Sequence, residues 1–349
     1  MVRVAIVNDI VMAAEVLKRL ILSVPGYEVA WLAYDGHEAV QKAKSDPPDL
    51  ILMDLIMPGM GGAQATKEIM ANSPCAILIV TASVSGNISH VFEAMGHGAL
   101  DVTAMPVLGN NIDSEGAQKL LQKIRMMHRL IGKEANVEEV ATTVAKPVQK
   151  EEGVPPLIVF GASTGGPLAL STILSQLPED FPAAVAIVQH VDSPFVENLV
   201  NWLGEQCPLP VRIAREGAVP RAGVVLVAGT SEHMVLTRNL QIHYTMHPKT
   251  CPYRPSVDVL FDSVARHWPQ PGVGVLLTGM GKDGAQGLKS LKDVGWQTIA
   301  QDKESCVVYG MPKAAAEMGA VGTVLPLEAI APELVRMINP YSTKTARNR

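Results

Sequence analysis

The chain has 349 residues, of which 48% are hydrophobic, enough apolar material for two domains or three with buried cores. Its formal net charge of −5 argues against a nucleic-acid-binding surface, for which a strong positive charge is usual. The four cysteines are scattered without paired spacing, which indicates reduced thiols and neither a disulfide framework nor a zinc site. The first residues are typical of a strand rather than a signal peptide, and no apolar run approaches the roughly 18 residues of a membrane span. We therefore expect a cytoplasmic protein that binds no nucleic acid and does not insert into membranes.

The first third of the chain alternates short apolar runs with helical patterns. The expected strands are residues 2–7, 29–33, 50–53, 76–80 and 101–104. The expected helices are residues 13–22, 36–43, 61–70, 88–95 and 115–130. Five successive strand–helix units, (βα)5, predict a doubly wound parallel sheet with helices on both faces.

Polar and acidic residues stand where these strands end. Asn8 and Asp9 follow the first strand, Asp54 follows the third, and Thr81 follows the fourth. Neighbouring carboxylates repel each other, but they become favourable together around a hard cation such as Mg²⁺, which can also orient a phosphoryl donor. Solvated acids at strand ends are the alternative. The stretch LMDLIMPGMGG at residues 52–62 is more specific than any single acid.

Residues 1–130 resemble the receiver domain of a two-component response regulator, and the stretch at residues 52–62 matches its phosphoacceptor motif. The resemblance implies that Asp54 is phosphorylated by a sensor histidine kinase as phosphodonor. It further implies that Asp9, Asp54 and the backbone carbonyl of Ile56 bind Mg²⁺, and that Thr81 is the switch hydroxyl.

Three positions depart from the receiver pattern. Asn8 stands where an aspartate is usual, Met105 replaces the lysine before a proline, and Val102 replaces the switch aromatic. A methionine cannot make the charge-assisted contact that the lysine makes with a phosphoryl group. Two alternatives follow: a receiver that still switches on phosphorylation, and one held in a single state.

Residues 131–153 are polar and lack a sustained apolar face, so they are expected to form a linker. Residues 154–340 then predict a second doubly wound parallel α/β domain with a hairpin, and the polar, basic residues 341–349 a flexible tail. The expected strands are residues 157–160, 184–189, 211–214, 224–228, 234–237, 241–244, 273–277 and 297–300. The expected helices are residues 168–177, 194–207, 256–267 (capped by Ser256), 287–294, 312–318 and 327–338.

Three residues of this domain suggest nucleophilic catalysis. Ser163 lies in a glycine-rich corner after a strand, His190 follows another strand, and Asp283 lies in the loop after a third. If these strands are parallel neighbours, the three side chains share the carboxyl edge of one sheet, where a base can activate a serine and an acid can orient the base. A structural histidine and a solvated aspartate are the alternative reading of this edge.

Other features allow other readings. A glycine-rich turn after a strand is often a phosphate or dinucleotide loop, but Ser163 replaces the middle glycine of that motif. Arg254 could orient an anionic substrate or be structural. His233, His243 and His247 resemble a metal cluster by number only, because their spacing fixes no ligand geometry.

This half of the chain resembles the catalytic domain of chemotaxis protein-glutamate methylesterases. The matching motifs are GASTGGP at 161–167, QH at 189–190, RPSVDVLF at 254–261, LTGMGKDG at 277–284 and SCVVYGMP at 305–312. The resemblance implies a catalytic triad of Ser163, His190 and Asp283, with the backbone N–H groups of Thr164 and Met280 as oxyanion donors. It implies hydrolysis of glutamate γ-methyl esters on methyl-accepting chemoreceptors, without a cofactor at the esterase site. Deamidation of receptor glutamine uses the same intermediate but a poorer leaving group, so it is expected to be slower or absent.

The two-domain arrangement suggests how the second domain could be regulated, and it leaves one rival function open. The receiver could cover the Ser163 edge until Asp54 is phosphorylated. The receiver departures, together with residues 93–101, resemble a branch of the family whose pathways control cyclic-dinucleotide signalling. The rival is a non-catalytic regulator whose second domain only binds receptors or partner proteins.

Overall fold

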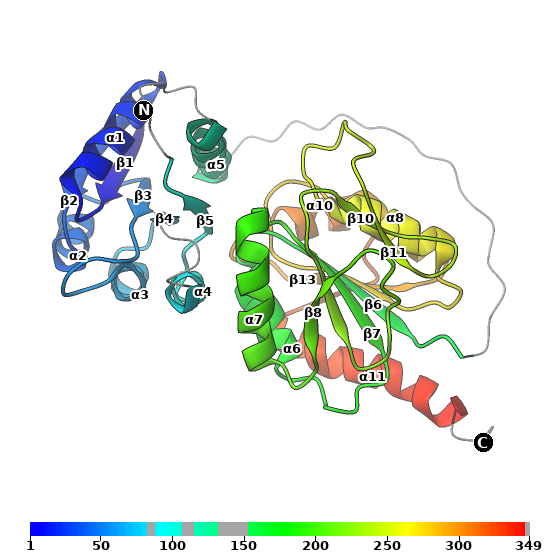
Figure 1. Cartoon of the computed structure of the whole chain (residues 1–349). Helices are drawn as coiled ribbons and strands as arrows, with labels where there is room; N and C mark the ends of the chain where they lie inside the picture. Colours follow the sequence, from blue (N-terminus) through cyan, green and yellow to red (C-terminus); the bar gives the residue numbers. More distant parts are fainter. Residues whose placement is uncertain (82–87, 107–114, 132–152, 346–349) are drawn as a thin grey trace. The chain divides into compact units, whose positions relative to one another are not determined.

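The computed structural model describes residues 1–81, 88–106, 115–131 and 153–345. The chain divides into two compact units, Met1–Glu138 and Glu139–Arg349 (Figure 1). Residues 132–152, which form most of the predicted linker, lie outside the described residues.

The first unit is a five-stranded parallel sheet with the strand order β2-β1-β3-β4-β5. Its strands are β1 (Val2–Val7), β2 (Tyr27–Ala33), β3 (Leu50–Met53), β4 (Ala76–Thr81) and β5 (Asp101–Ala104). Its helices are α1 (Val11–Leu22), α2 (Gly36–Ser45), α3 (Gly62–Asn72), α4 (Ile88–Gly96) and α5 (Glu115–Ile131). Every predicted strand and helix of this unit is confirmed, with ends that differ by one or two residues.

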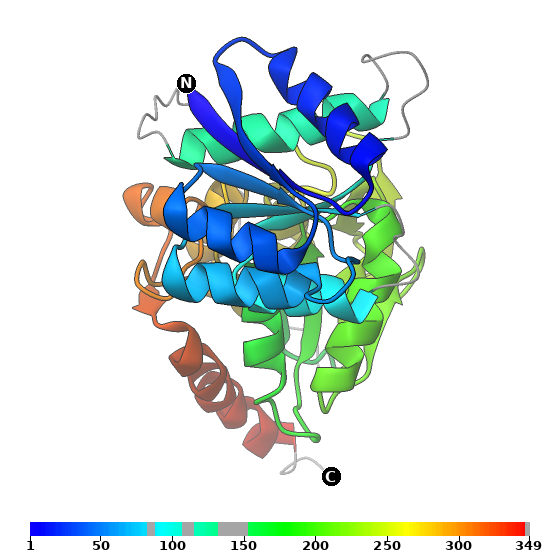
Figure 2. The same ribbon diagram turned by 90° about the vertical axis from the view of Figure 1, so that its left-hand side faces the viewer.

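Helices cover both faces of this sheet (Figure 2). Helices α1 and α5 share one apolar cluster with alternate residues of the strands, such as Val4, Ile6 and Leu52. Helices α2, α3 and α4 pack side by side on the other face. The central strand β3 is buried along its whole length, as a strand covered on both faces must be, and this burial explains its unbroken apolar sequence.

The second unit is a seven-stranded parallel sheet with the order β14-β13-β12-β6-β7-β9-β8, and an antiparallel hairpin, β10-β11. Its strands are β6 (Leu157–Ala162), β7 (Ala184–Gln189), β8 (Val211–Ala214), β9 (Val225–Ala228), β10 (His233–Leu236), β11 (Ile242–Thr245), β12 (Val273–Leu276), β13 (Gln297–Gln301) and β14 (Thr323–Leu325). Its helices are α6 (Gly166–Leu174), η1 (Ser193–Phe195), α7 (Val196–Gln206), α8 (Val257–His267), α9 (Ala285–Asp293), α10 (Met311–Glu317) and α11 (Leu327–Thr345).

The order of the strands places the candidate site. Strands β12, β6 and β7 are direct neighbours, and all three run in the same direction. The residues that follow them therefore meet at one edge of the sheet, where open α/β sheets hold their ligands. The predicted hairpin is confirmed as β10-β11, with Val235 opposite His243, and it packs on α8.

The structure differs from the sequence analysis at two places near the end of the chain. Strand β14 was missed because only three residues pair with β13 and all three are partly or fully exposed, so they carry no apolar alternation. Residues 341–345 were expected in a flexible tail, yet α11 continues through them to Thr345. Among the described residues no helix is long and apolar enough to cross a membrane.

Candidate active site

The turn after β6 presents Ser163 at a tight corner. The Ser163 N–H donates to the Thr278 carbonyl (3.1 Å), and the Ser163 carbonyl accepts from the Gly166 N–H (2.8 Å), where α6 begins. Gly165 has a φ of +77°, and a Cβ there would lie 2.6 Å from the Val307 Cβ. The corner therefore requires glycine both for its backbone conformation and for its close packing.

His190 lies directly beside this corner. Its N–H donates to the carbonyl of Ala162, the residue before Ser163 (2.9 Å). The ring Nε2 lies 2.8 Å from Asp283 Oδ2, and the ring stacks on Tyr253 with centroids 4.5 Å apart. The other ring nitrogen, Nδ1, is buried and has no hydrogen-bond partner among the described residues. A neutral ring that donates Nε2–H to Asp283 thus keeps its Nδ1 lone pair free to accept a proton.

The carboxylate of Asp283 is held at the N-terminus of α8. Its Oδ1 accepts from the Ser256 hydroxyl (2.7 Å) and the Asp258 N–H (3.2 Å), and its Oδ2 accepts from the Val257 N–H (2.7 Å) and His190. Burial opposes ionisation here, but the hydrogen bond and charge of His190 with these further donors hold the pKa of Asp283 below its usual value. Burial and the charge of Asp283 raise the pKa of neighbouring Asp258 to about 7. The negative charge of the pair is therefore concentrated on Asp283, which faces His190.

One buried glutamine links the serine and histidine turns. The Gln189 Nε2 donates to the Ser163 carbonyl (2.8 Å) and to the His190 carbonyl (3.0 Å). Its side chain is 4% exposed, so water does not compete for these bonds. Sequence reasoning noted Gln189 only as part of a motif, because its role depends on a contact 26 residues away in the chain.

The backbone N–H groups of Thr164 and Met280 have no acceptor among the described residues, whereas those of Ser163 and Gly279, directly before them, do. The Thr278 hydroxyl donates to the Thr164 carbonyl (2.9 Å) and accepts from the Val308 N–H (2.9 Å). A Cβ on Gly279 would lie 2.8 Å from the Ser163 Cβ, so the loop that carries Met280 passes directly against the serine. Two free donors on loops joined by Thr278 are an arrangement that can bind an oxyanion.

Thr278→Val is expected to lower kcat for ester hydrolysis about 10- to 100-fold, because it removes one buried hydroxyl that joins both donor loops. Thr278→Ser keeps the hydroxyl and is expected to stay within about fivefold of the wild type. Steady-state kinetics of both variants, with thermal unfolding as a check on folding, test this role. Equal kcat values for the two variants would contradict it.

The structure brings Ser163, His190 and Asp283 to one sheet edge, but no hydrogen bond joins the Ser163 hydroxyl to His190 among the described residues. In substrate-free sites such bonds are often long and tighten only with substrate. Two of the three histidines that resembled a metal cluster by number have other side-chain partners. His233 bonds to Pro248 and Ser256, and His243 Nδ1 lies 2.6 Å from a Glu216 carboxylate oxygen. Within the described ranges no three potential ligands gather around a metal position.

In the first unit, Asp54 lies at the end of β3 and is buried. Its Oδ2 accepts from the Asn8 side-chain amide (2.8 Å), and its Oδ1 accepts from the Leu55 N–H (2.7 Å). Burial raises the pKa of Asp54 to about 6, and the charge of Asp9 adds to that effect. Asn8, read from the sequence only as a departure, is thus a direct partner of the predicted phosphoacceptor.

The two other departures lie on or beside β5. Thr81 is buried at the end of β4, and its carbonyl accepts from the Met105 N–H (2.8 Å). The Met105 side chain is partly buried and packs against the apolar cluster of α1 and α5, while Val102 is fully buried. Both side chains therefore contribute to packing.

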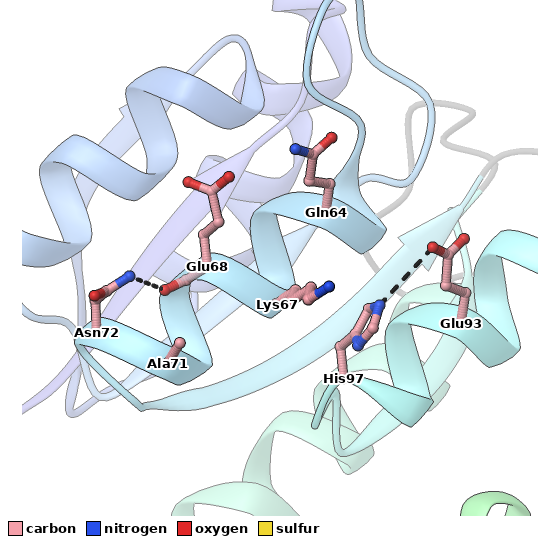
Figure 3. A pocket seen from close by; sticks show the side chains of 7 residues that line it. All are labelled: Gln64, Lys67, Glu68, Ala71, Asn72, Glu93 and His97. Atoms are coloured by element: carbon pink, nitrogen blue, oxygen red, sulfur yellow. Dashed lines mark hydrogen bonds and ion pairs between the residues drawn. The ribbon is translucent and has the colours of Figure 1, made fainter.

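A groove of about 400 Å³ lies between α3 and α4 (Figure 3). The residues that line it are Gln64, Lys67, Glu68, Ala71, Asn72, Glu93 and His97. His97 Nε2 lies 3.8 Å from a Glu93 carboxylate oxygen, and the Asn72 side chain donates to the Glu68 carbonyl (2.8 Å). None of the predicted site residues lines this groove.

The edge of the second sheet, with Ser163, is typical of a hydrolase, and the acidic strand ends of the first sheet, with Asp54, are typical of a receiver domain. Comparison with known proteins supports both assignments. Residues 158–334 match the CheB methylesterase family, and residues 4–113 match the response regulator receiver domain. The chain therefore belongs to the CheB methylesterase family, with a receiver domain that precedes the catalytic domain.

Close relatives cover nearly the whole chain. It is 51% identical to "Protein-glutamate methylesterase/protein-glutamine glutaminase 4" of Burkholderia thailandensis over 96% of this chain and 97% of that protein. It is 51% identical to "Protein-glutamate methylesterase/protein-glutamine glutaminase 1" of Bordetella avium over 97% and 98%. The crystal structure of the Thermotoga maritima CheB methylesterase catalytic domain covers 53% of this chain and 99% of that one, with 36% identity and a TM-score of 0.51.

Proposed function

We propose that this chain hydrolyses γ-methyl esters of glutamate on methyl-accepting chemoreceptors and releases methanol, with Ser163, His190 and Asp283 as the catalytic residues. The observation that carries the assignment is the ring of His190, which contacts the ionised Asp283 through Nε2 and leaves Nδ1 without a hydrogen-bond partner among the described residues. The backbone of the same residue bonds to Ala162, directly before Ser163. The names of the relatives that match the chain end to end support the substrate.

In the first step, His190 Nδ1 takes the proton of the Ser163 hydroxyl while the serine oxygen attacks the ester carbonyl. The C–O single bond forms as the carbonyl becomes an oxyanion. Asp283 remains ionised, fixes the tautomer with its proton on Nε2, and stabilises the imidazolium ring that results. The stack on Tyr253 holds the plane of the ring.

The oxyanion binds to the backbone N–H groups of Thr164 and Met280, each such donor contributing about 3 kcal/mol. As the intermediate collapses, His190 returns the proton to the leaving oxygen and methanol departs. Water then repeats the sequence on the acyl-serine and regenerates Ser163 with a receptor glutamate. A glutamine side chain passes through the same intermediate with ammonia as the poorer leaving group, so we propose deamidation as a slower second activity. The relatives carry both activities in their names.

The receiver regulates this site through phosphorylation of Asp54, with a sensor histidine kinase as the phosphodonor. The carboxylates of Asp9 and Asp54 with the Ile56 carbonyl are hard oxygen donors, and they fit a Mg²⁺ ion. The fit is supported by the pKa of Asp54, which burial raises to about 6 with a contribution from the charge of Asp9, because a bound cation would favour the ionised form of both carboxylates. When bound, Mg²⁺ neutralises charge on the phosphoryl donor. Thr81 is the switch hydroxyl in this proposal.

We place the protein in the cytoplasm, which the four unpaired cysteines support.

The full-length chain with Mg²⁺ and a small phosphodonor is expected to release methanol from methylated receptor membranes several-fold faster than without the phosphodonor. The reason is that phosphorylation at Asp54 shifts the receiver between two states that act differently on the catalytic domain. Asp54→Asn cannot accept the phosphoryl group and is expected to respond less than about 1.5-fold, at a basal rate like that of the wild type. A phosphodonor response that survives in Asp54→Asn would contradict the assignment of the phosphoacceptor.

A further inference from the structure

We propose that His233 is a positioning residue for the esterase reaction, acting through Ser256 on the orientation of Asp283. The inference rests on the proposed function and adds a residue that lies in none of the motifs at the site. His233 begins β10 and is 0% exposed, and its ring contacts the segment that leads into α8.

Both ring nitrogens of His233 are used. Nδ1 accepts a hydrogen bond from the Ser256 N–H (3.1 Å), and Nε2 donates to the Pro248 carbonyl (3.2 Å). Since the Ser256 N–H can only donate, the proton of the ring must lie on Nε2 and the ring must be neutral. One tautomer of one side chain therefore satisfies two backbone groups.

Ser256 passes this constraint to the catalytic carboxylate. It is the N-cap of α8, and its hydroxyl donates to Asp283 Oδ1 (2.7 Å). Asp283 in turn contacts His190 (2.8 Å). Three successive hydrogen bonds thus connect His233, Ser256, Asp283 and His190. A shift of the Ser256 backbone moves the hydroxyl and the first N–H groups of α8 together.

The same ring ties the two ends of residues 248–256. Pro248 is bonded at one end and Ser256 at the other, and Tyr253 between them stacks on the His190 ring with an interplanar angle of 10°. His233 therefore supports two groups that orient His190: the carboxylate at Nε2 and the aromatic ring on its face. A residue in this position can hold the geometry of an active site although it does not touch the substrate.

The surroundings keep His233 in the neutral form that both bonds require. Burial lowers its pKa, and the charge of Arg254 acts in the same direction, while the Pro248 hydrogen bond and the charge of Asp283 oppose them. A protonated ring would direct a second N–H at the Ser256 N–H. Because both ring nitrogens are engaged in these bonds, His233 is a fixed structural link and has no nitrogen left to bind a metal.

The test compares His233→Leu with His233→Gln in the full-length chain, with methanol release from methylated receptor membranes as the readout. Leucine supplies no polar atom, so kcat is expected to fall about 10- to 100-fold with KM changed less than about twofold. Glutamine supplies one acceptor and one donor. The decrease in log kcat is therefore expected to be at most half as large in His233→Gln as in His233→Leu. His243→Leu, on the paired strand and exposed, is the matched control and is expected to stay within about twofold.

A double-mutant cycle with Ser256→Ala shows whether His233 acts through Ser256. We expect the loss caused by His233→Gln or His233→Leu to be at least about threefold smaller in the Ser256→Ala background. Independent, multiplicative losses would overturn the inference, as would a wild-type kcat in His233→Leu or a rise in KM alone. If His233→Leu does not fold, the cycle with His233→Gln decides. Wild-type protein without methanol release would instead refute the proposed function itself.

Discussion

His190→Gln is expected to reduce kcat for methanol release about 10⁵- to 10⁶-fold, the largest effect of any substitution outside the nucleophile. The variant lacks the base that takes the serine proton and the acid that protonates the leaving oxygen, and both roles belong to one ring. Rates with methylated receptor membranes at matched protein concentration measure the loss. KM is expected to change little, because the ring acts in the transition state.

The control for this substitution is His243→Gln, whose ring lies on the surface beside Glu216 and is expected to leave kcat within about twofold. Thermal unfolding of both variants shows whether the fold is kept. A folded His190→Gln protein with more than about one-tenth of the wild-type kcat would contradict the assignment of the base.

Asp283→Asn is expected to reduce kcat about 10⁴-fold. The carboxylate accepts four hydrogen bonds, from Ser256, Val257, Asp258 and His190. An amide has one oxygen to accept them, and its NH₂ group must face either the α8 N–H groups or the His190 Nε2. In the second case the ring is forced into the wrong tautomer, and in either case the imidazolium loses its negative partner.

Asp258→Asn is the matched control, because the same change is made 25 residues away in sequence on a carboxylate that does not contact His190. The pKa of Asp258 is raised to about 7, so its neutral form is already well populated at neutral pH. Its Oδ1 accepts from the Gly287 N–H, a bond that an amide oxygen can keep. We expect a loss of less than about tenfold. Equal losses for the two variants would contradict a specific role for Asp283.

The main features of the site were predictable from the sequence because parallel strands end at a common edge. Apolar runs of four to six residues gave β6, β7 and β12, and the residues after them had to lie close together once the strands were neighbours. The fold class of both domains is confirmed for the same reason, since regular alternation of strands and helices permits few other architectures.

The residues that support the site could not be predicted in this way. Gln189, Thr278 and Ser256 each bond to groups that are distant in the chain, and their contacts depend on the register of the sheet and the path of loops. His233 was grouped with His243 and His247 because they share a residue type, yet its burial and its two backbone partners separate it from them. Burial and hydrogen-bond partners are properties of the fold, and no local pattern encodes them.

In the receiver domain the sequence identified the positions, and the structure shows their partners. The carboxyl edge held Asp54 as expected, but the direct bond from the Asn8 amide was not anticipated. An aspartate at position 8 would add another negative charge there, whereas the Asn8 amide donates a hydrogen bond to the Asp54 carboxylate. This bond gives Asn8 a physical role in holding the Asp54 carboxylate.

The most direct test of the central claim is methanol release from methylated chemoreceptor membranes by the full-length wild type and by Ser163→Ala at equal concentration. The account predicts release by the wild type and a loss of about 10⁵- to 10⁶-fold in kcat for the variant, with its thermal unfolding unchanged. Methanol release by a folded Ser163→Ala protein at a rate near that of the wild type would contradict the account, because no acyl-serine could then lie on the path.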